Sequence, residues 1–372
     1  MGMAQLVILG LMAVSVVLGA WAIQKDTAPV WRFAVPKPVQ ASGAPVFATI
    51  FDYETSAGQA HSPSIVIKED GLDVMWFEGS EEAQADVDIH FAGFQKTSGG
   101  WHKTASGTRI TRAGLGAVFE PRQLVVTLGN TLDQQDGHGG IYATVVSVGG
   151  WAMASVADVA MGPEGPTRAR KLNLSPFLNR SHLVKSPVVP FTDGTRGLPA
   201  YFEMGAAHGV LARLDAQGRV RDTVRIAGAG KPIQPMIVPL DEMRAVAWLR
   251  DFEPSGQLLT CRTADGGKTW SEVAATDMPN PSAPVAALAL GAGRILMAAN
   301  DDPSGQDRMR LLLSDDEGAS WRVLQELEPN GAGARYPMLQ TLQGGEIVLA
   351  YSVGNKQGLR VHVLNAAWVA AQ

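Results

Sequence analysis

The stretches TADGGKTW (residues 263–270) and SDDEGASW (residues 314–321) carry the same short pattern of Asp, Gly and Trp, and each follows a short apolar run. Because an Asp side chain closes tight turns and glycine permits left-handed backbone, each stretch predicts a β-hairpin whose Trp begins the returning strand. Trp270 and Trp321 are 51 residues apart (321 − 270). That spacing suits one four-stranded blade, so the repeat predicts a β-propeller.

Weaker copies of the pattern extend this period along the chain. Gly-Gly turns precede Trp101 and Trp151, a turn without Trp occupies 215–220, and Trp368 lies near the C-terminus. These copies and the two complete ones predict six units.

A second series supports the same count. Six short apolar runs are each opened by a proline, at Pro63, Pro121, Pro187, Pro235, Pro281 and Pro337. Proline at the first position of a strand costs no ladder hydrogen bond, so each run is predicted to be the innermost strand of a blade. The loops that lead into these strands would converge on one end of the axis, where we expect an active site.

Composition and charge limit the classes of partner and cofactor that are expected. The chain has 372 residues, a net charge of −5 and 18% charged residues. Without a basic stripe, a nucleic-acid partner is not expected. The single cysteine, Cys261, forms no intramolecular disulfide, and no Cys/His spacing or EF-hand-like run predicts a metal or other cofactor. The sequence makes no prediction of oligomeric state.

The N-terminus carries a membrane or export signal. Residues 4–23 are uncharged and almost wholly apolar, and the segment is about as long as a helix that spans a bilayer. An uncleaved anchor is favoured because no Lys or Arg precedes the run; a signal cleaved after Ala20-Trp21-Ala22 is the alternative. We therefore expect a membrane segment over 1–23, a proline-containing linker over 24–45 and a propeller over 46–372, exported to the periplasm or the extracellular space.

The Asp-containing turns (Asp boxes), the repeat length and the proline-led strands resemble the sialidase (neuraminidase) superfamily. The resemblance covers about residues 46–370 and is strongest over 230–352. It implies an all-β, six-bladed propeller with a glycan site on the axis. Asp boxes also occur in non-catalytic propellers, so they say little about activity.

Taken residue by residue, the resemblance implies a catalytic set. Tyr336 in ARYPMLQTL (334–342) matches the nucleophile, and Asp86 in the acidic loop of VMWFEGSEEAQADVDI (74–89) matches the acid/base. A neutral phenol suits a substrate whose anomeric carbon bears a carboxylate, because an anionic nucleophile would be repelled. Gln234 stands where the family has the glutamate that activates the tyrosine, and an amide is no general base near neutral pH.

The resemblance also implies a substrate-binding set. Arg250 and Arg308 match two of three arginines that hold the substrate carboxylate bidentately, and His61 stands in the place of the third. Asp251, Arg335 and Asn280 are further candidates for contacts with substrate. The residues that could replace the missing base are Asp251, Glu203, Glu120, Asp301 and His61.

The sequence thus predicts an exo-acting glycoside hydrolase of the sialidase type, acting on surface or extracellular glycans, with altered sugar specificity. The departures at His61 and Gln234 favour one alternative, a non-catalytic propeller that binds glycan or protein in the handling of envelope polysaccharide. A polysaccharide lyase, with Tyr336 or His61 as the proton-abstracting base, is the second alternative.

Overall fold

The computed structural model describes residues 2–25, 28–56, 58–135, 137, 139–253, 255–303, 305–328, 331 and 333–372. The chain divides into two compact units, Met1–Val30 and Trp31–Gln372. The first contains helix α1 (Met3–Lys25). Its segment Met3–Gln24 has a mean hydropathy of 2.5 and is long and apolar enough to cross a membrane, a test that a signal sequence also passes.

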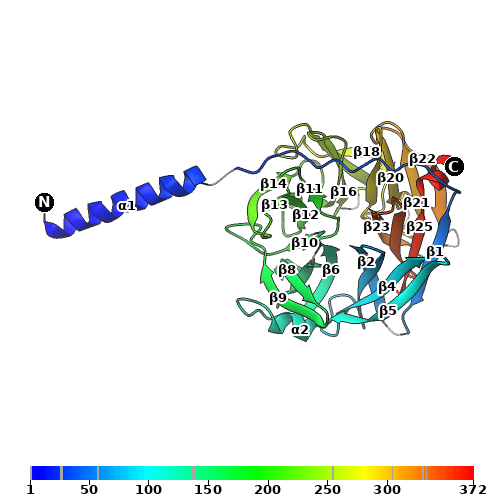
Figure 1. Cartoon of the computed structure of the whole chain (residues 1–372), viewed down its shortest axis with the longest axis horizontal. Helices are drawn as coiled ribbons and strands as arrows, with labels where there is room; N and C mark the ends of the chain where they lie inside the picture. Colours follow the sequence, from blue (N-terminus) through cyan, green and yellow to red (C-terminus); the bar gives the residue numbers. More distant parts are fainter. Residues whose placement is uncertain are drawn as a thin grey trace. The chain divides into compact units, whose positions relative to one another are not determined.

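The second unit is a ring of six antiparallel sheets, which confirms the predicted six-bladed, all-β propeller (Figure 1). Blade one contains β2 (Gln59–Lys68), β3 (Gly71–Gly79), β4 (Asp88–Thr97) and β5 (Gly100–Ile110); blade two contains β6 (Thr127–Asp133), β7 (Ile141–Val146), β8 (Ala154–Gly162) and β9 (Gly165–Lys171). Blade three contains β10 (His182–Val184), β11 (Val189–Pro190), β12 (Arg196–Phe202), β13 (His208–Leu214) and β14 (Val220–Ile226).

Blade four contains β15 (Pro232–Pro239), β16 (Ala245–Asp251), β17 (Gln257–Thr263) and β18 (Ala274–Pro279); blade five contains β19 (Ala286–Gly291), β20 (Arg294–Ala299), β21 (Met309–Ser314) and β22 (Arg322–Leu327). Blade six contains β23 (Arg335–Thr341), β24 (Ile347–Val353), β25 (Gly358–Leu364) and β1 (Phe47–Glu54). The short helices are α2 (Arg112–Ala117), η1 (Gly150–Met153) and α3 (Ala366–Ala371).

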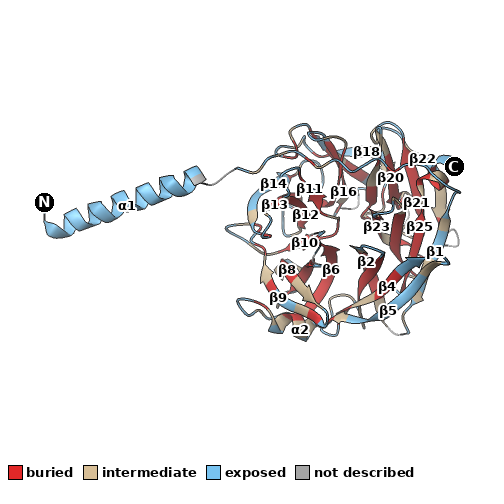
Figure 2. Cartoon of the chain, in the orientation of Figure 1, coloured by how far each residue is buried: buried red, intermediate tan, exposed pale blue. Residues whose placement is uncertain are grey.

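The hydrophobic core lies between neighbouring blades. Inner strands such as β6 and β15 are buried along their whole length, whereas the outer strand β5 is mostly exposed (Figure 2). Trp248 of β16 shows the packing, since its ring meets that of Trp321 in blade five with centroids 5.5 Å apart. Apolar faces that point toward the next blade therefore hold the ring together.

Blade six is completed by both ends of the propeller. Its outer strand is β1, which pairs with β25 from Phe47↔Leu364 to Glu54↔Gly358. Trp368, predicted as the tryptophan of a sixth hairpin, instead lies in α3, where its ring packs 4.8 Å from that of Phe47. That assignment was wrong because the fourth strand of this blade comes from the N-terminal side of the chain.

The two complete Asp boxes form the predicted turns. The Asp265 carboxylate accepts hydrogen bonds from Thr269 N (2.9 Å) and Thr269 Oγ1 (2.6 Å), and Asp316 accepts the same pair from Ser320 (2.8 and 2.6 Å). Trp101 likewise follows the β4–β5 turn. Trp151 also lies in a hairpin turn, between the antiparallel strands β7 and β8, but it belongs to η1 and precedes the returning strand, so the prediction that it begins that strand was wrong.

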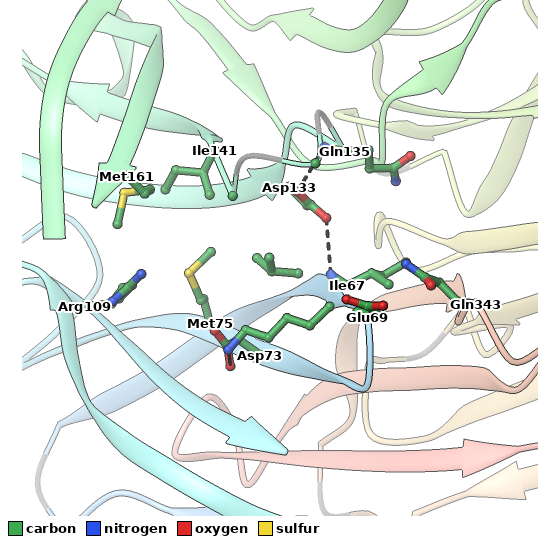
Figure 3. A pocket seen from close by; sticks show the side chains of 14 residues that line it. Ile67, Glu69, Asp73, Met75, Arg109, Asp133, Gln135, Ile141, Met161 and Gln343 are labelled. Carbon is green, nitrogen blue, oxygen red and sulfur yellow. Dashed lines mark hydrogen bonds and ion pairs between the residues drawn. The ribbon is translucent and has the colours of Figure 1, made fainter. Parts of the chain in front are cut away.

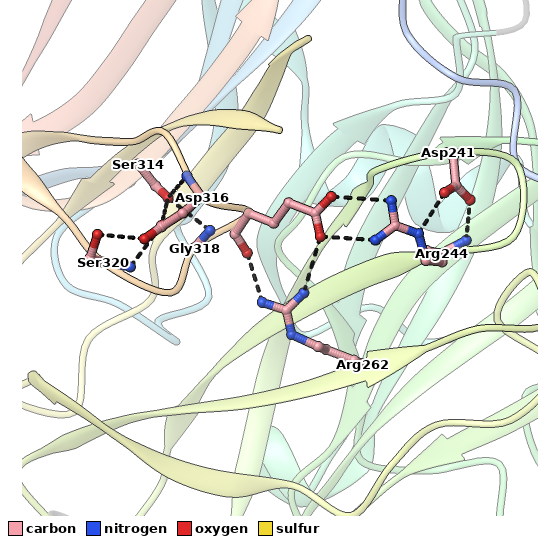
Figure 4. A network of polar contacts seen from close by, with 8 residues as sticks. Asp241, Arg244, Arg262, Ser314, Asp316, Gly318 and Ser320 are labelled. Atoms are coloured by element: carbon pink, nitrogen blue, oxygen red, sulfur yellow. Dashed lines mark hydrogen bonds and ion pairs between the residues drawn. The ribbon is translucent and has the colours of Figure 1, made fainter. Parts of the chain in front are cut away.

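The second Asp box also joins two blades. Arg244, between β15 and β16, donates from both terminal nitrogens to the Glu317 carboxylate at 2.9 and 3.1 Å (Figure 4). Arg262 of β17 donates to the Glu317 backbone oxygen at 2.7 Å. The turn of blade five is thereby held against blade four.

The prolines proved only partly informative. Pro63, Pro235 and Pro337 do lie in inner strands, but inside them, where the pairing register shifts between His61/Ser64, Ile233/Met236 and Arg335/Met338. An interrupted ladder tolerates proline as well as a strand start does. Pro281 precedes β19. Pro187 lies between β10 and β11, and Pro121 lies outside the strands, so these two do not open inner strands.

Residues 31–39, which we call the strap, lie within the segment expected to be a linker and pack against the propeller. Phe33 is fully buried, with its ring 5.0 Å from that of Phe191. Backbone hydrogen bonds run from Phe33 N to Glu242 O (2.8 Å) and from Val39 N to Leu290 O (3.3 Å). The strap thus crosses the ends of blades three, four and five at the face where the inner strands finish, the exit face.

Candidate functional site

The inner strands start at the opposite face, the entry face, and there a backbone feature recurs. In five blades a non-glycine residue near the start of the inner strand has left-handed backbone with φ of 53–56°: Ser62, Ser181, Gln234, Ser282 and Tyr336. Such residues are uncommon and persist only where the surrounding structure holds them. A bulge changes the direction of the side chain it carries. This backbone feature therefore determines which side chains lie at the mouth of the axis.

A cavity of about 290 Å³ opens at this mouth. It draws on blades one, two, three, four and six, and its lining residues are Glu82, Asn130, Thr144, Trp151, Leu183, Tyr201, Glu203, Arg250, Phe252, Tyr336 and Lys356. We call it the entry pocket. Two residues of the predicted site, Tyr336 and Arg250, line it.

Tyr336 is held from several sides. Arg250 Nη1 donates to its hydroxyl at 3.3 Å. The His61 ring meets the tyrosine ring edge to face, with centroids 4.4 Å apart. Lys185 Nζ donates to the oxygen of Pro337 at 2.8 Å and lies 5.8 Å from the centre of the tyrosine ring. The phenol is therefore fixed in position before any ligand binds.

Arg250 is the penultimate residue of β16 and is oriented by its neighbours. Its Nε donates to Ser282 Oγ at 3.0 Å, and that hydroxyl donates to the backbone oxygen of Asp251 at 2.7 Å. Its Nη1 also approaches Gln234 Oε1 at 3.5 Å, at the outer limit of a hydrogen bond. The guanidinium thus faces the pocket as a positioned cation.

His61 does not replace the missing arginine as a cation. It is buried, with Nδ1 2.8 Å from Ser352 Oγ. Burial, and secondarily the charges of nearby cationic side chains, lowers the pKa of His61 well below its usual 6.5. The imidazole is neutral at pH 7, and it packs against Tyr336 as an uncharged ring.

Like His61, four other predicted binding residues are not among those that line the pocket. Arg308 is paired with Asp302 at 3.1 Å. The buried Asp251 carboxylate accepts from the backbone N–H groups of Lys231 and Glu253, so it holds the segment before β15 and the segment after β16.

Asn280 and Arg335 are the other two. Asn280 accepts from Ala283 N at 2.8 Å and donates to Asn300 O at 3.3 Å, which gives it a structural part. Arg335 begins β23, where burial lowers its pKa and the charge of Asp307 opposes that change. The structure therefore brings none of the four into the pocket lining.

Asp86, predicted as the acid/base, is an exposed loop residue outside the pocket lining. Its carboxylate accepts from Ser80 N and Ser80 Oγ, both at 3.0 Å, and these bonds lower its pKa. Glu82 of the same loop does line the pocket, and its carboxylate is 2.5 Å from Lys356 Nζ. The acidic loop was identifiable from sequence, but the loop member that enters the pocket was not.

Glu203 and Tyr201 complete the polar lining. Burial raises the pKa of Glu203, the charge of Arg250 opposes this, and the charge of Glu82 adds to it. Tyr201 is fully buried, and burial together with the charges of Glu203 and Tyr336 raises its pKa well above 10. Gln234 Nε2 donates to the Tyr201 hydroxyl at 3.3 Å. Sequence reasoning missed Lys356, together with Asn130, Thr144, Leu183 and Phe252, because none of these lining residues lies in a recognisable motif.

A larger cavity, of about 590 Å³, lies between blades one and two toward the exit face. Met75 and Met161 face each other across it, with Arg109 and Asp73 nearby (Figure 3). The Asp133 carboxylate is used by the backbone of Ile67 (3.2 Å) and Gln135 (2.9 Å), and Asp73 is paired with Lys68 at 2.6 Å. These carboxylates are engaged in contacts that stabilise the fold. In the entry pocket, by contrast, the side chains of Arg250 and Tyr336 are held in position at the cavity. No cluster of three or more potential metal ligands occurs among the described residues.

Comparison with solved structures gives the same fold at low identity. Hadza microbial sialidase Hz136 aligns with 83% of this chain at a TM-score of 0.64 and 14% identity, and this chain spans 66% of that one. The leech intramolecular trans-sialidase complexed with 2,7-anhydro-Neu5Ac aligns over 87% of this chain and 72% of its own chain, with a TM-score of 0.64 and 11% sequence identity. A protein of unknown function from Dyadobacter fermentans aligns over 86% of this chain and 99% of its own chain, with a TM-score of 0.62 and 14% sequence identity.

No curated protein matches the sequence. The sequence model of the family described as "BNR repeat-like domain" matches residues 70–349, which is three quarters of the chain and includes strands of all six blades. With the ring of six blades and the neighbouring sialidase structures, this match settles the family: the chain belongs to the BNR repeat-like domain family and is a sialidase-like propeller.

Proposed function

We propose that the propeller is an exo-acting glycoside hydrolase of the sialidase type, with a sugar specificity other than that of the sialidases. The observation that carries this proposal is Tyr336, held in a left-handed bulge at the entry pocket with Arg250 bonded to its hydroxyl. The pocket volume is near the lower end for small-molecule sites, which suits one terminal sugar residue.

The tyrosine supplies the nucleophile. Its phenolate oxygen attacks the anomeric carbon and forms a glycosyl–enzyme intermediate that water then hydrolyses. Arg250 stabilises the negative charge on the phenol oxygen, or contacts an anionic substituent of the sugar, because a guanidinium donates strong charge-assisted hydrogen bonds. The acidic loop between β3 and β4 protonates the leaving group, with Glu82 in the pocket and Asp86 the loop residue expected from the sequence.

The charges of the pocket support a changed specificity. Its lining contains two cations, Arg250 and Lys356, and two carboxylates, Glu82 and Glu203. A site for a carboxylate sugar gains from surplus positive charge, but these four charges balance. With His61 neutral and Arg308 paired to Asp302, we propose a neutral or weakly charged terminal sugar as the substrate.

The second candidate is a non-catalytic propeller that binds a glycan or a protein. Gln234 favours it, since its amide is bonded to Tyr201 and cannot take a proton from Tyr336.

Turnover by the full-length chain in detergent separates the two candidates. The chain and its Tyr336→Phe variant are assayed on a panel of fluorogenic glycosides that includes a sialoside, with thermal unfolding as the folding control. Turnover lost in the variant supports the hydrolase, and turnover kept contradicts the nucleophile. Saturable binding to a glycan array without any turnover supports the second candidate.

We also propose that α1 exports the propeller, as an anchor or a cleaved signal, so that it meets glycans outside the cytoplasm. The exposed apolar helix Met3–Gln24 supports this. Fractionation of cells and N-terminal sequencing of the mature chain test it. A full-length chain in the soluble cytoplasmic fraction would contradict both forms.

A further inference from the structure

A tyrosine nucleophile needs a group to take its proton, and position 234 holds an amide. Gln234 Nε2 donates to Tyr201, and its Oε1 lies 3.5 Å from Arg250. Both ends of the amide are thus engaged, and an amide has negligible basicity near neutral pH. The proton acceptor has to come from another element around the pocket.

Glu203 is placed to supply it. It follows β12 directly at the entry face, and its backbone N donates to the oxygen of Ser181 at 3.2 Å, which ties it to the inner strand of blade three. Tyr201, two residues earlier, shares its side of the strand because side chains alternate. Both line the entry pocket.

The other acidic side chains around the mouth are occupied. Glu82 is paired with Lys356, Asp251 accepts from two backbone N–H groups, and Asp86 accepts from Ser80. Within the described part of the chain, Glu203 is the pocket-lining carboxylate with neither an ion pair nor a side-chain hydrogen bond.

Glu203 and Tyr336 belong to one electrostatic cluster. The charges of both act on the buried hydroxyl of Tyr201. Arg250, bonded to Tyr336, also acts on Glu203. The cluster therefore joins blades three, four and six around the phenol.

The environment of Glu203 suits a base. Burial and the charge of Glu82 raise its pKa above its usual 4.5, against the opposing charge of Arg250. A base becomes more effective as its proton affinity approaches that of the group it deprotonates, provided that it remains ionised at the working pH.

We propose, on the basis of the function proposed above, that Glu203 takes the proton of Tyr336 in place of the residue at position 234. As the phenol O–H bond breaks, its proton passes to a Glu203 oxygen and the phenol oxygen bonds to the anomeric carbon. The glycosidic C–O bond breaks, and the leaving oxygen takes a proton from the acidic loop. Water then attacks the anomeric carbon, its proton returns to the loop, and the released phenolate recovers its proton from Glu203.

A carboxylate swap tests this assignment in the full-length chain. Glu203→Gln is expected to lower kcat by about 10²–10⁴-fold, the usual range for general acid–base catalysis, with KM changed less than threefold. Adding Gln234→Glu to Glu203→Gln is expected to restore at least tenfold of the loss, because it places a carboxylate beside Arg250, which is bonded to Tyr336. Glu272→Gln, on the exposed outer side of blade four, is the matched control. Activity of Glu203→Gln within threefold of the unchanged chain overturns the proposal.

A second readout needs no substrate. A phenol whose proton is taken by a neighbouring base reacts faster with an aryl sulfonyl fluoride, and mass spectrometry locates the label on Tyr336, with Tyr336→Phe as the blank. Glu203→Gln is expected to slow this labelling at pH 7 at least threefold, whereas Glu272→Gln leaves it unchanged. If no glycoside is turned over, the hydrolase proposal fails and this labelling alone decides: a slower reaction supports the transfer of the Tyr336 proton to Glu203, and an unchanged rate overturns it.

Discussion

Arg250 Nη1 donates to the Tyr336 hydroxyl at 3.3 Å and so joins the second strand of blade four to the inner strand of blade six across the mouth of the axis. Neither residue comes from the same blade as the acidic side chains Glu203 and Glu82. The pocket therefore exists only in the closed ring.

The arginine makes the first prediction. Arg250→Met is expected to lower kcat/KM by about tenfold to a hundredfold, because a charge-assisted hydrogen bond contributes about 1.5–3 kcal/mol. Arg308→Met is expected to change it less than threefold, since Arg308 is paired with Asp302 and lies outside the pocket lining. Steady-state kinetics of both variants measure the difference, and equal losses would mean that Arg308 reaches the substrate.

The second prediction concerns the acidic loop between β3 and β4. Glu82→Gln is expected to lower kcat at least tenfold, whereas Asp86→Asn leaves it within threefold, since only Glu82 lines the pocket. An aryl glycoside with a good leaving group should recover most of the Glu82→Gln loss, because departure of such a group needs little proton transfer. The reverse ranking of the two variants would return the acid/base role to Asp86.

The third prediction concerns His61. His61→Arg is expected to lower the free energy of unfolding by about 2–5 kcal/mol, because it introduces a charge without a partner at a buried site against Tyr336 and Phe77. His61→Gln keeps a neutral hydrogen-bonding side chain for Ser352 and should cost less. Urea unfolding compares them. A stable His61→Arg chain with higher affinity for acidic sugars would show that this position accepts a cation.

The fourth prediction concerns the strap. Phe33→Ala is expected to lower the free energy of unfolding of the propeller by about 3–5 kcal/mol, since it leaves a cavity beside Phe191. Val35→Ala, at a half-exposed position of the same segment, should change it by no more than about 0.5 kcal/mol. Equal effects would show that the strap adds no stability through Phe33.

The fifth prediction follows from the Asp box of blade five. Hydrogen bonds from Ser320 and Ser314 lower the pKa of Asp316 to about 2 from its usual 3.8. A carboxyl with a depressed folded-state pKa stabilises the fold above its unfolded value and loses that contribution as pH falls. Asp316→Ala should therefore lower the urea midpoint at pH 7, with a difference that shrinks between about pH 4 and pH 2.

The neighbouring Asp315→Ala variant is the control for that pH series. Asp315 is exposed and lies 3.8 Å from Arg322, so its removal should move the midpoint little at any pH. A constant effect of Asp316→Ala down to pH 2 would show that its carboxylate does not act through the turn.

The features that could be predicted from the sequence are those that depend on residues close together along the chain. The two Asp boxes specify their turns through side chains within a few residues, so the blade repeat could be predicted. Tyr336 and Arg250 were identified by their register with the sialidase superfamily, and both line the entry pocket. A Gly-Gly-Trp run is less specific. Trp101 lies in the returning strand β5, whereas Trp151 lies in the 3₁₀ turn between β7 and β8 and lines the pocket.

The rest of the pocket depends on contacts between distant segments. Glu82 meets Lys356 from 274 positions away (356 − 82), and Glu203 comes from a third blade. No local period links these positions. Charged residues at the ends of strands are common, and only the closed ring determines which of them face the axis.

The pairing of β1 with β25 has a consequence for biosynthesis. Glu54 pairs with Gly358, 304 positions later (358 − 54). At about 5–20 residues per second, β1 leaves the ribosome roughly 15–60 s before its partner, and a strand that waits with unpaired backbone groups invites aggregation. Asp52 and Glu54 give this strand negative charge, and in the finished ring Asp52 pairs with Arg360. The nascent chain thus carries, on the strand that will close the ring, charged side chains that keep it from pairing with other chains in the meantime.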